Sequence, residues 1–372
     1  MKDIKFYIKG VINMDKVRIG IIGCGGIANN KHMPALSKLP DVEMVAFCDI
    51  IVERAEKAAK EFGIEGAKVY QDYKELLKDE TIDVVHVLTP NREHSFITVD
   101  ALEAGKHVMC EKPMAINTAE AQKMIDAANR TGKKLTIGYQ NRYRPDSWYL
   151  KRACENDELG EIYYARAHAI RRRAVPTWGV FLNEEEQGGG PLIDIGTHAL
   201  DLTLWMMDNY EPKMVVGSVY KKLGDQTETG NAWGDWDPEK FTVEDSAFGY
   251  IVMKNGATIN LEASWALNSL DVDEAKTSLC GVKAGADMKD GLRINKVKYG
   301  KQVVEKVDLA AGGVAFFDGG AAEPQDIEAR MWIDAVKNDT EVVVKPEQAI
   351  VVTKILEAIY KSAAEGKPVY FD

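Results

Sequence analysis

The feature that most constrains the fold is a glycine-rich turn between an apolar run and a helical pattern. Residues 17–22 are apolar apart from one arginine, and residues 23–28 read Gly-Cys-Gly-Gly-Ile-Ala, which fits G-x-G-x-x-G/A. In this setting Gly23 permits a tight turn, Gly25 lets the backbone approach a pyrophosphate, and Ala28 keeps the helix close to the strand. The turn predicts a dinucleotide-binding unit. The alternative is a turn of the same shape that holds no nucleotide.

The cofactor contacts expected from the sequence extend past the glycines. Gly26 and Ile27 lie at a helix N-terminus, where the backbone dipole favours phosphate. Asp49 ends the second predicted strand, about twenty residues past the turn, where a carboxylate accepts both ribose hydroxyls and repels a 2′-phosphate. This predicts NAD rather than NADP, with Ile50 beside the adenine. The alternative for Asp49 is a helix N-cap.

Apolar runs alternate with helical patterns through the first third of the chain. Strands are expected at 17–22, 42–48, 84–88, 107–110 and 135–137, and helices at 27–39, 52–62, 72–77, 93–104 and 118–130. Such alternation predicts an α/β unit, a doubly wound parallel sheet with helices on both faces. Ligands bind at the carboxyl edge of these sheets, so we expect Thr89, Asn91 and His94 to contact the cofactor. The alternative for His94 is a plain first-turn helix residue.

The second part of the chain has a different pattern. Strand-like stretches occupy 161–171, 213–222, 241–253 and 257–266, and helical ones 193–207, 325–337 and 346–364. This predicts an α+β domain with a broad sheet, one face covered by its helices and the other offered to a second subunit. The expected organisation is an N-terminal extension at 1–16, a nucleotide-binding domain at 17–140, and a substrate-binding and oligomerisation domain at 141–372.

Two clusters carry candidate chemistry. Glu111-Lys112-Pro113 follows the fifth strand, where the lysine would stabilise a developing alkoxide. Asp194 and His198, four residues apart, share a helix face after a run of three glycines. Removal of hydride from a secondary alcohol needs a base for the hydroxyl proton, and imidazole suits that work at neutral pH. His198 is therefore the predicted base, oriented by Asp194; the alternatives are a core histidine and a capping carboxylate.

Composition excludes several classes of protein. The net charge of -11 disfavours nucleic acid and anionic membranes as partners. No apolar run approaches the ~20 residues of a membrane span, and the first residues lack a secretion signal. Five cysteines without a CxxC pair argue against disulfides and fit a cytoplasmic protein, and the six histidines show no paired spacing for a metal. Asp201 is expected to pair with a backbone group or an arginine rather than with substrate.

Taken together, these motifs resemble the Gfo/Idh/MocA oxidoreductases, which include glucose-fructose oxidoreductase and inositol dehydrogenase. The resemblance runs from about residue 17 to the C-terminus and rests on the glycine turn, Glu-Lys-Pro and Gly-Gly…Asp-x-x-x-His. It implies that Lys112 lies beside the nicotinamide, with Glu111 among the cofactor-binding residues, and that Asp194 and His198 contact the substrate and its proton. It further implies a C-terminal domain with a large open, mostly antiparallel sheet used in homo-oligomer contacts, as a dimer, tetramer or hexamer.

A narrower likeness concerns residues 171–181, Arg-Arg-Arg-Ala-Val-Pro-Thr-Trp-Gly-Val-Phe. They resemble family members that oxidise the C3 hydroxyl of glucosides. That likeness implies that Trp178 stacks on a sugar or aglycone, and that Arg142 and Tyr143 supply hydrogen bonds. Each of the three has an alternative place in the protein core.

The expected function is oxidation of a secondary hydroxyl, at C3, of a sugar or glycoside by hydride transfer to NAD. Two alternatives within enzymes are an inositol or cyclitol dehydrogenase, and an NAD-dependent glycosidase that oxidises its substrate transiently and then eliminates the aglycone. Outside enzymes, the alternative is a regulatory protein that senses NAD without catalysis.

Overall fold

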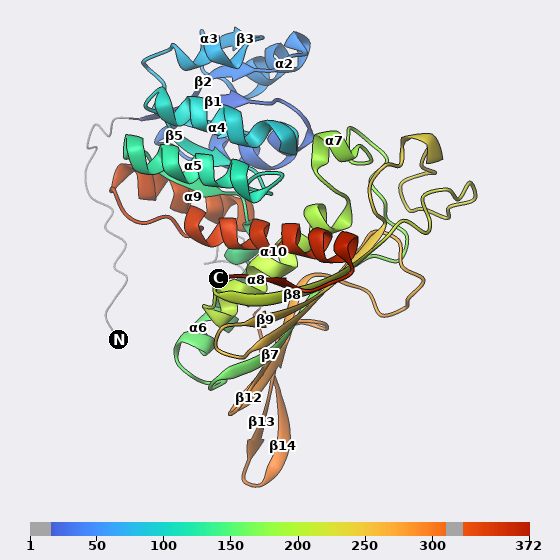
Figure 1. The fold of residues 1–372 in the computed structure, drawn as a ribbon. Coiled ribbons are helices and arrows are strands. Elements are labelled where there is room, and N and C mark those ends of the chain that lie inside the picture. The colour runs from blue at the N-terminus through green and yellow to red at the C-terminus, as the bar shows by residue number, and fades with distance from the viewer. Residues whose placement is uncertain (1–15, 310–322) are drawn as a thin grey trace.

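The computed structural model describes residues 16–309 and 323–372; the expected extension at 1–16 lies outside them except for its last residue. Six parallel strands form the first sheet in the order β3-β2-β1-β4-β5-β6 (Figure 1). They are β1 (Val17–Ile22), β2 (Val42–Cys48), β3 (Lys68–Tyr70), β4 (Val84–Val87), β5 (His107–Cys110) and β6 (Leu135–Ile137). This confirms the doubly wound sheet, whose strand order reverses between β1 and β4.

Helices connect these strands as the periodicity predicts. They are η1 (Ala28–His32), α1 (Met33–Ser37), α2 (Val52–Phe62), α3 (Tyr73–Leu77), η2 (Asn91–Glu93), α4 (His94–Glu103) and α5 (Thr118–Thr131). The Asn117 side chain caps α5 by accepting from the Glu120 N–H at 2.9 Å. The helix expected at 27–39 differs from the prediction because it opens with a π-helical turn, η1, before α1 begins.

Nine strands form the second sheet, in the order β14-β13-β12-β11-β7-β10-β9-β8-β15. Only β7 and β10 are parallel, so the sheet is mostly antiparallel, as the family resemblance implied. The strands are β7 (Ile162–Ile170), β8 (Pro212–Tyr220), β9 (Ser246–Met253), β10 (Thr258–Ser264), β11 (Asp273–Gly281), β12 (Ala284–Asp287), β13 (Arg293–Lys298), β14 (Lys301–Lys306) and β15 (Val369–Tyr370). In Figure 1 the hairpin β13–β14 projects beyond the body of the protein.

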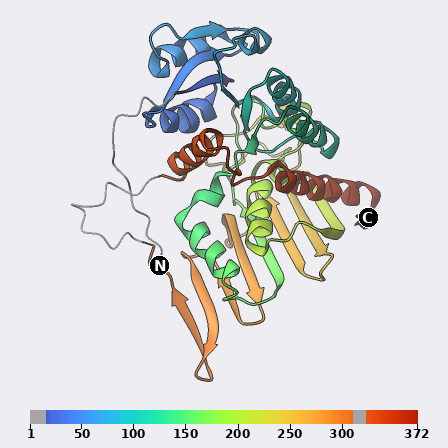
Figure 2. The same cartoon turned by 90° about the vertical axis from the view of Figure 1, so that its left-hand side faces the viewer.

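Eight further helical segments complete the described fold. They are η3 (Gln140–Tyr143), α6 (Pro145–Glu155), α7 (Glu184–Gln187), η4 (Leu192–Gly196), α8 (Thr197–Met207), η5 (Pro238–Lys240), α9 (Pro324–Lys337) and α10 (Pro346–Glu365). Figure 2 shows α6, α8 and α10 in front of the strands. No helix within 16–309 and 323–372 is long and apolar enough to cross a membrane.

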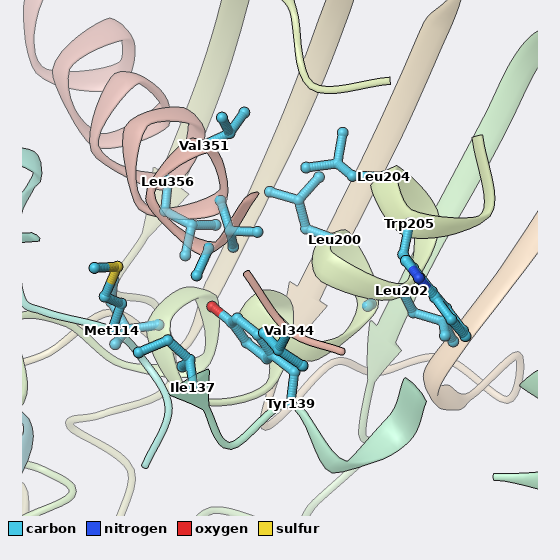
Figure 3. Packing of buried hydrophobic residues seen from close by; sticks show 14 of the residues in the cluster. Met114, Ile137, Tyr139, Leu200, Leu202, Leu204, Trp205, Val344, Val351 and Leu356 are labelled. Carbon is cyan, nitrogen blue, oxygen red and sulfur yellow. The ribbon is translucent and has the colours of Figure 1, made fainter. Parts of the chain in front are cut away.

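Two hydrophobic clusters hold the layers together. The larger one places α8 and α10 against the second sheet and reaches the first sheet through residues such as Met114, Ile137 and Tyr139 (Figure 3). The smaller cluster lies on one side of the first sheet and includes Trp332 and Ile333 of α9. Helix α9, near the C-terminus, therefore completes the core on one side of the N-terminal sheet. No local pattern in the sequence of α9 indicates this packing.

A buried ion pair connects the end of the first unit to α8. The Arg142 guanidinium donates to both carboxylate oxygens of Asp201, at 2.9 and 2.7 Å, and to the backbone oxygen of Val343. Both side chains are almost fully buried, at 0% and 1% exposure. The expectation that Asp201 pairs with an arginine is confirmed. A buried pair of this kind is costly to break, because the remaining charge has no partner.

We expect Arg142→Met to lower the free energy of unfolding by about 3–5 kcal/mol, since Asp201 is left buried without its partner. Urea unfolding followed by circular dichroism measures the loss. The control is Arg130→Met, which removes a largely exposed pair with Glu103 and should cost at most about 1 kcal/mol. Equal, small losses in the two variants would contradict the assigned role of the buried pair.

Candidate active site

The glycine turn has the shape that a dinucleotide requires. Gly23 has a φ of +91°, and a side chain there would meet the Leu88 backbone oxygen at 2.6 Å. Its N–H donates to the Cys48 oxygen at 2.8 Å, which ties the turn to β2. At Gly25, by contrast, a Cβ would have no neighbour within 4 Å. The backbone is thus packed against the protein at Gly23 and open at Gly25, where a pyrophosphate can approach.

Asp49 accepts hydrogen bonds from two backbone N–H groups, in addition to the ribose contact that the sequence predicts. Its carboxylate accepts from the Cys24 N–H of the glycine turn and from the Ile51 N–H before α2, both at 2.9 Å. It therefore fixes the turn and the start of the helix together, and each oxygen keeps a lone pair for a ribose hydroxyl. Ile50, at 77% exposure, and Ile27, at 41%, place exposed apolar surface beside it. These residues fit an adenosine with free ribose hydroxyls.

At the carboxyl edge of β4, the side chains predicted to contact the cofactor differ in whether they have partners within the protein. Asn91 donates to the Gln187 backbone oxygen at 3.0 Å, so it connects this edge to α7. Thr89 is half-buried, and its hydroxyl oxygen is buried without a partner among the described residues. An unpaired hydroxyl at the edge of the sheet fits a ligand that carries hydrogen-bonding groups.

His94 corrects the prediction that it contacts the cofactor. Its ring is 1% exposed, and its two nitrogens lie 2.7 Å from the Pro113 oxygen and 2.9 Å from the Thr89 oxygen. Burial lowers the pKa of this imidazole below its usual value. Both ring nitrogens lie against backbone carbonyls, and the one that carries the proton donates, so His94 lies between the turns that follow β4 and β5 and connects them. Glu111 is likewise buried, and its carboxylate accepts from the backbone N–H of Lys112 at 3.0 Å.

Lys112 and Asp194 form the centre of the site. The Lys112 ammonium donates to Asp194 Oδ1 at 2.9 Å and to the Asp194 backbone oxygen at 3.0 Å. The other carboxylate oxygen, Oδ2, accepts from the Trp265 indole N–H at 3.0 Å. Burial alone would raise the pKa of Asp194, but Lys112 and Arg171 hold it below its usual value. The site thus keeps an ammonium and a carboxylate, both partly accessible.

The glycine run before Asp194 explains how its helix is placed. A Cβ at Gly189 would lie 2.1 Å from the Tyr360 hydroxyl, so only glycine fits there. The Glu244 carboxylate accepts from the Gly190 N–H at 2.8 Å, the Leu192 N–H at 3.1 Å and the Tyr360 hydroxyl at 2.8 Å. This carboxylate caps the π-helical turn η4, and π-turns of this kind are frequent at functional sites.

His198 follows on α8 and remains neutral. Burial, followed by the nearby Lys112 charge, lowers the pKa of this imidazole to about 3. Its Nδ1 is buried and has no hydrogen-bond partner among the described residues, and its ring meets Tyr139 edge-on at 6.3 Å. The other ring nitrogen, Nε2, is not among the buried unpaired atoms and makes no hydrogen bond within the described residues. It is therefore the nitrogen that a ligand hydroxyl beside Lys112 and Asp194 can reach and to which it can pass a proton.

An aromatic wall extends outward from Asp194. Trp265 contacts Phe181, which contacts Trp178, which contacts Trp233, with edge-on ring separations of 6.5, 6.0 and 5.0 Å. Trp178 is 52% exposed and Trp233 44%. The Arg171 guanidinium lies 5.2 Å from the Trp233 ring and pairs with Glu274. The wall begins fully buried at the carboxylate and ends at solvent, and the predicted Trp178 is in its exposed part.

The predictions for Arg142 and Tyr143 as substrate contacts are corrected. Arg142 is fully buried in its pair with Asp201, and Tyr143 is 3% exposed. The sequence also missed residues that the fold brings to the site from far away, namely Lys31, Trp265, Glu244 and Tyr360. None of them belongs to a local motif. The one available signal was the pair Glu244-Asp245 directly before β9, because two carboxylates next to an apolar strand are expected to be buried and then need partners.

A dinucleotide cradle next to a lysine, a carboxylate and a neutral imidazole defines an NAD-binding oxidoreductase. The chain belongs to the Gfo/Idh/MocA oxidoreductase family. Residues 17–139 match the family described as "Oxidoreductase family, NAD-binding Rossmann fold", and residues 151–371 match its "C-terminal alpha/beta domain". Together they cover nearly the whole described chain, which confirms the family, the fold and the cofactor class that the sequence predicted.

Individual relatives are sugar-related oxidoreductases. The chain is 36% identical to D-glucoside 3-dehydrogenase of Escherichia coli (strain K12), over 96% of this chain and 99% of that one. It is 33% identical to glucose-6-phosphate 3-dehydrogenase of Bacillus subtilis (strain 168), over 66% and 67%. A solved levoglucosan dehydrogenase, in complex with NADH and levoglucosan, has the same fold, with a TM-score of 0.81 at 22% identity over 95% and 99% of the two chains.

Proposed function

We propose that this protein oxidises a secondary hydroxyl, at C3, of a sugar or glycoside to a ketone, with NAD as the hydride acceptor. The observation that carries the proposal is the group formed by Lys112, Asp194 and His198 on the side of the protein where the glycine turn opens. The Lys112 ammonium, the Asp194 carboxylate and the accessible Nε2 of the neutral His198 imidazole lie together there. These three groups suit the oxidation of an alcohol, because the hydroxyl proton must be removed as the carbon is oxidised.

The residues divide the work as follows. The substrate hydroxyl lies between the Lys112 ammonium and the His198 ring, and His198 accepts its proton. An imidazole with a pKa of about 3 is a weak base, so the proton moves only where Lys112 stabilises the alkoxide that forms. Asp194 holds Lys112 in position and accepts from a neighbouring sugar hydroxyl. NAD supplies the hydride acceptor when it is bound at the glycine turn.

Sugar selectivity is supported by the aromatic wall and by the relatives. Sugars present C–H faces that pack on aromatic rings, and Trp178 offers such a ring next to the polar group. The 3-dehydrogenases among the relatives act, by name, on glucoside and glucose 6-phosphate. We assign the same position, C3, to the substrate of this chain and a glycoside as its preferred form.

We also propose a cytoplasmic homo-oligomer. All five cysteines are free thiols, which accords with a reducing compartment. The face of the second sheet opposite α8 exposes Val216 and Tyr250 in register, beside a hollow of about 350 Å³ lined by charged residues such as Arg166, Glu262 and Lys276. An exposed sheet face with an apolar band and a charged hollow suits a second copy of the chain.

The reaction is tested by following NADH absorbance with NAD and a panel of glucosides, glucose and inositols. We expect NADH to form fastest with glucosides, and Lys112→Met to lower kcat about 10²- to 10³-fold because the developing alkoxide loses its counter-charge. Aglycone release without NADH would instead identify a glycosidase, and preference for inositols a cyclitol dehydrogenase. NADH binding without turnover of any substrate would identify a sensor.

The pH dependence tests the state of His198. Its pKa in the free enzyme lies near 3, below the usual value, so the imidazole stays unprotonated as pH falls through about 6.5. We therefore expect kcat/KM to change less than about threefold between pH 5.5 and 7.5. A tenfold loss per pH unit below about 6.5 would mean that His198 titrates as a free imidazole does and would contradict this assignment.

Oligomerisation is tested by sedimentation equilibrium. Tyr250→Glu buries a charge in the expected contact, so the variant should sediment at the mass of one chain or of a smaller assembly. Tyr149→Glu, a partly exposed position on α6 of the helix-covered side, is the matched control and should keep the wild-type mass. A monomeric wild type, or equal effects of both variants, would overturn the proposed interface.

A further inference from the structure

A buried ionic cluster lies beneath the turn that carries Lys112. It joins three segments distant in sequence: Lys31 on η1, Glu111 after β5, and Glu328 on α9. The Lys31 ammonium lies 2.7 Å from Glu111 Oε1 and 2.9 Å from Glu328 Oε2. The three side chains are 8%, 7% and 3% exposed. The cluster is therefore shielded from solvent, and each member depends on the others for its charge to be tolerated.

Glu111 links this cluster to the backbone of the active-site lysine. Its Oε2 accepts from the Lys112 N–H at 3.0 Å, while its Oε1 lies 2.8 Å from His32 Nε2 as well as near Lys31. Gly138 leaves the necessary space, because a Cβ there would lie 3.0 Å from Glu111 Oε1. The carboxylate thus fixes the turn from which Lys112 reaches Asp194.

The electrostatics favour the charged forms of Lys31 and Glu111. Burial alone would lower the pKa of Lys31, but Glu111 and Glu328 raise it above its usual value. Burial would likewise raise the pKa of Glu111, but Lys31 and His32 hold it well below its usual value. Lys31 therefore shares its charge between two carboxylates. Without Glu328, the Lys31 ammonium would keep Glu111 as its one acidic partner among the described residues, and it could then move from its present position.

Glu328 differs from the other two members because it comes from α9. That helix packs Trp332 and Ile333 into the core beneath the first sheet, which sets the position of Glu328 one turn earlier. Lys31 follows the glycine turn by a few residues, so the cluster connects α9 to both the phosphate-facing turn and the lysine-bearing turn. The C-terminal segment can thereby affect the cofactor side of the site without touching a ligand.

We propose that Glu328 is a positioning residue, which acts through Lys31 and Glu111 to hold Lys112 and the glycine turn in their working arrangement. The kinetic part of this proposal rests on the proposed sugar oxidation. The part that concerns the cofactor does not, because NADH binding can be measured without a sugar.

The experiment compares Glu328→Gln with Asp334→Asn, a matched change on α9 at a partly exposed carboxylate. For Glu328→Gln we expect NADH affinity, from fluorescence titration, to fall threefold or more, and kcat to fall tenfold or more with the KM for glucoside within threefold. Asp334→Asn should leave both unchanged. If wild type proves inactive towards every sugar, the NADH titration still decides the matter.

A double-mutant cycle tests the route through Lys31. Because Glu328 acts through Lys31, adding Glu328→Gln to Lys31→Met should cause no further loss of NADH affinity or kcat. If Glu328→Gln does not fold, Glu328→Asp keeps the charge, shortens its reach and should give the same pattern with smaller losses. Wild-type NADH affinity and kcat in a folded Glu328 variant would overturn the proposal, as would additive losses in the cycle.

Discussion

The ion pair between Lys112 and Asp194 is the interaction on which the site depends. Lys112 follows the fifth strand of the first sheet, and Asp194 belongs to the π-turn that precedes α8, so the 2.9 Å contact joins the two units where we propose that the cofactor and the substrate meet. Neighbouring residues hold both partners of this ion pair in position. Glu244 and Tyr360 hold the glycine run before Asp194, Trp265 orients its second oxygen, and Glu111 holds the backbone of Lys112.

Burial then decides what each ionisable group can do. Asp194 remains a carboxylate because Lys112 and Arg171 offset its desolvation. His198 remains neutral because its burial and the Lys112 charge outweigh the opposing effect of Asp194 and Glu111. Two groups four residues apart are thus driven to opposite roles, one charged and one ready to accept a proton. The same environment makes the imidazole a weak base, so the proposed reaction needs the Lys112 charge and the His198 nitrogen on one oxygen.

The sequence predicted those features that depend on residues close together in the chain. The glycine turn is recognised from a few consecutive residues, and Asp49 ends the strand that follows it. Asp194 and His198 are one helical turn apart, so their spacing alone predicts that they share a helix face. His94 and Arg142 were wrong as ligand contacts because their partners, Pro113 and Asp201, are brought by the fold. Lys31, Glu244 and Trp265 were missed for the same reason. The strands β3 and β11–β14 and the helix α6 were missed because their sequences mix polar and apolar residues without a clear period.

The most direct test of the central claim follows the hydrogen itself. A glucoside that carries deuterium at C3 is incubated with the enzyme and NAD, and the dinucleotide product is examined by proton NMR. If the C3 carbon is oxidised at this site, the deuterium appears at C4 of the nicotinamide of NADH, and the sugar is recovered as its 3-keto form. Deuterium that stays at C3, or that is released to water while NAD is unchanged, would contradict the account.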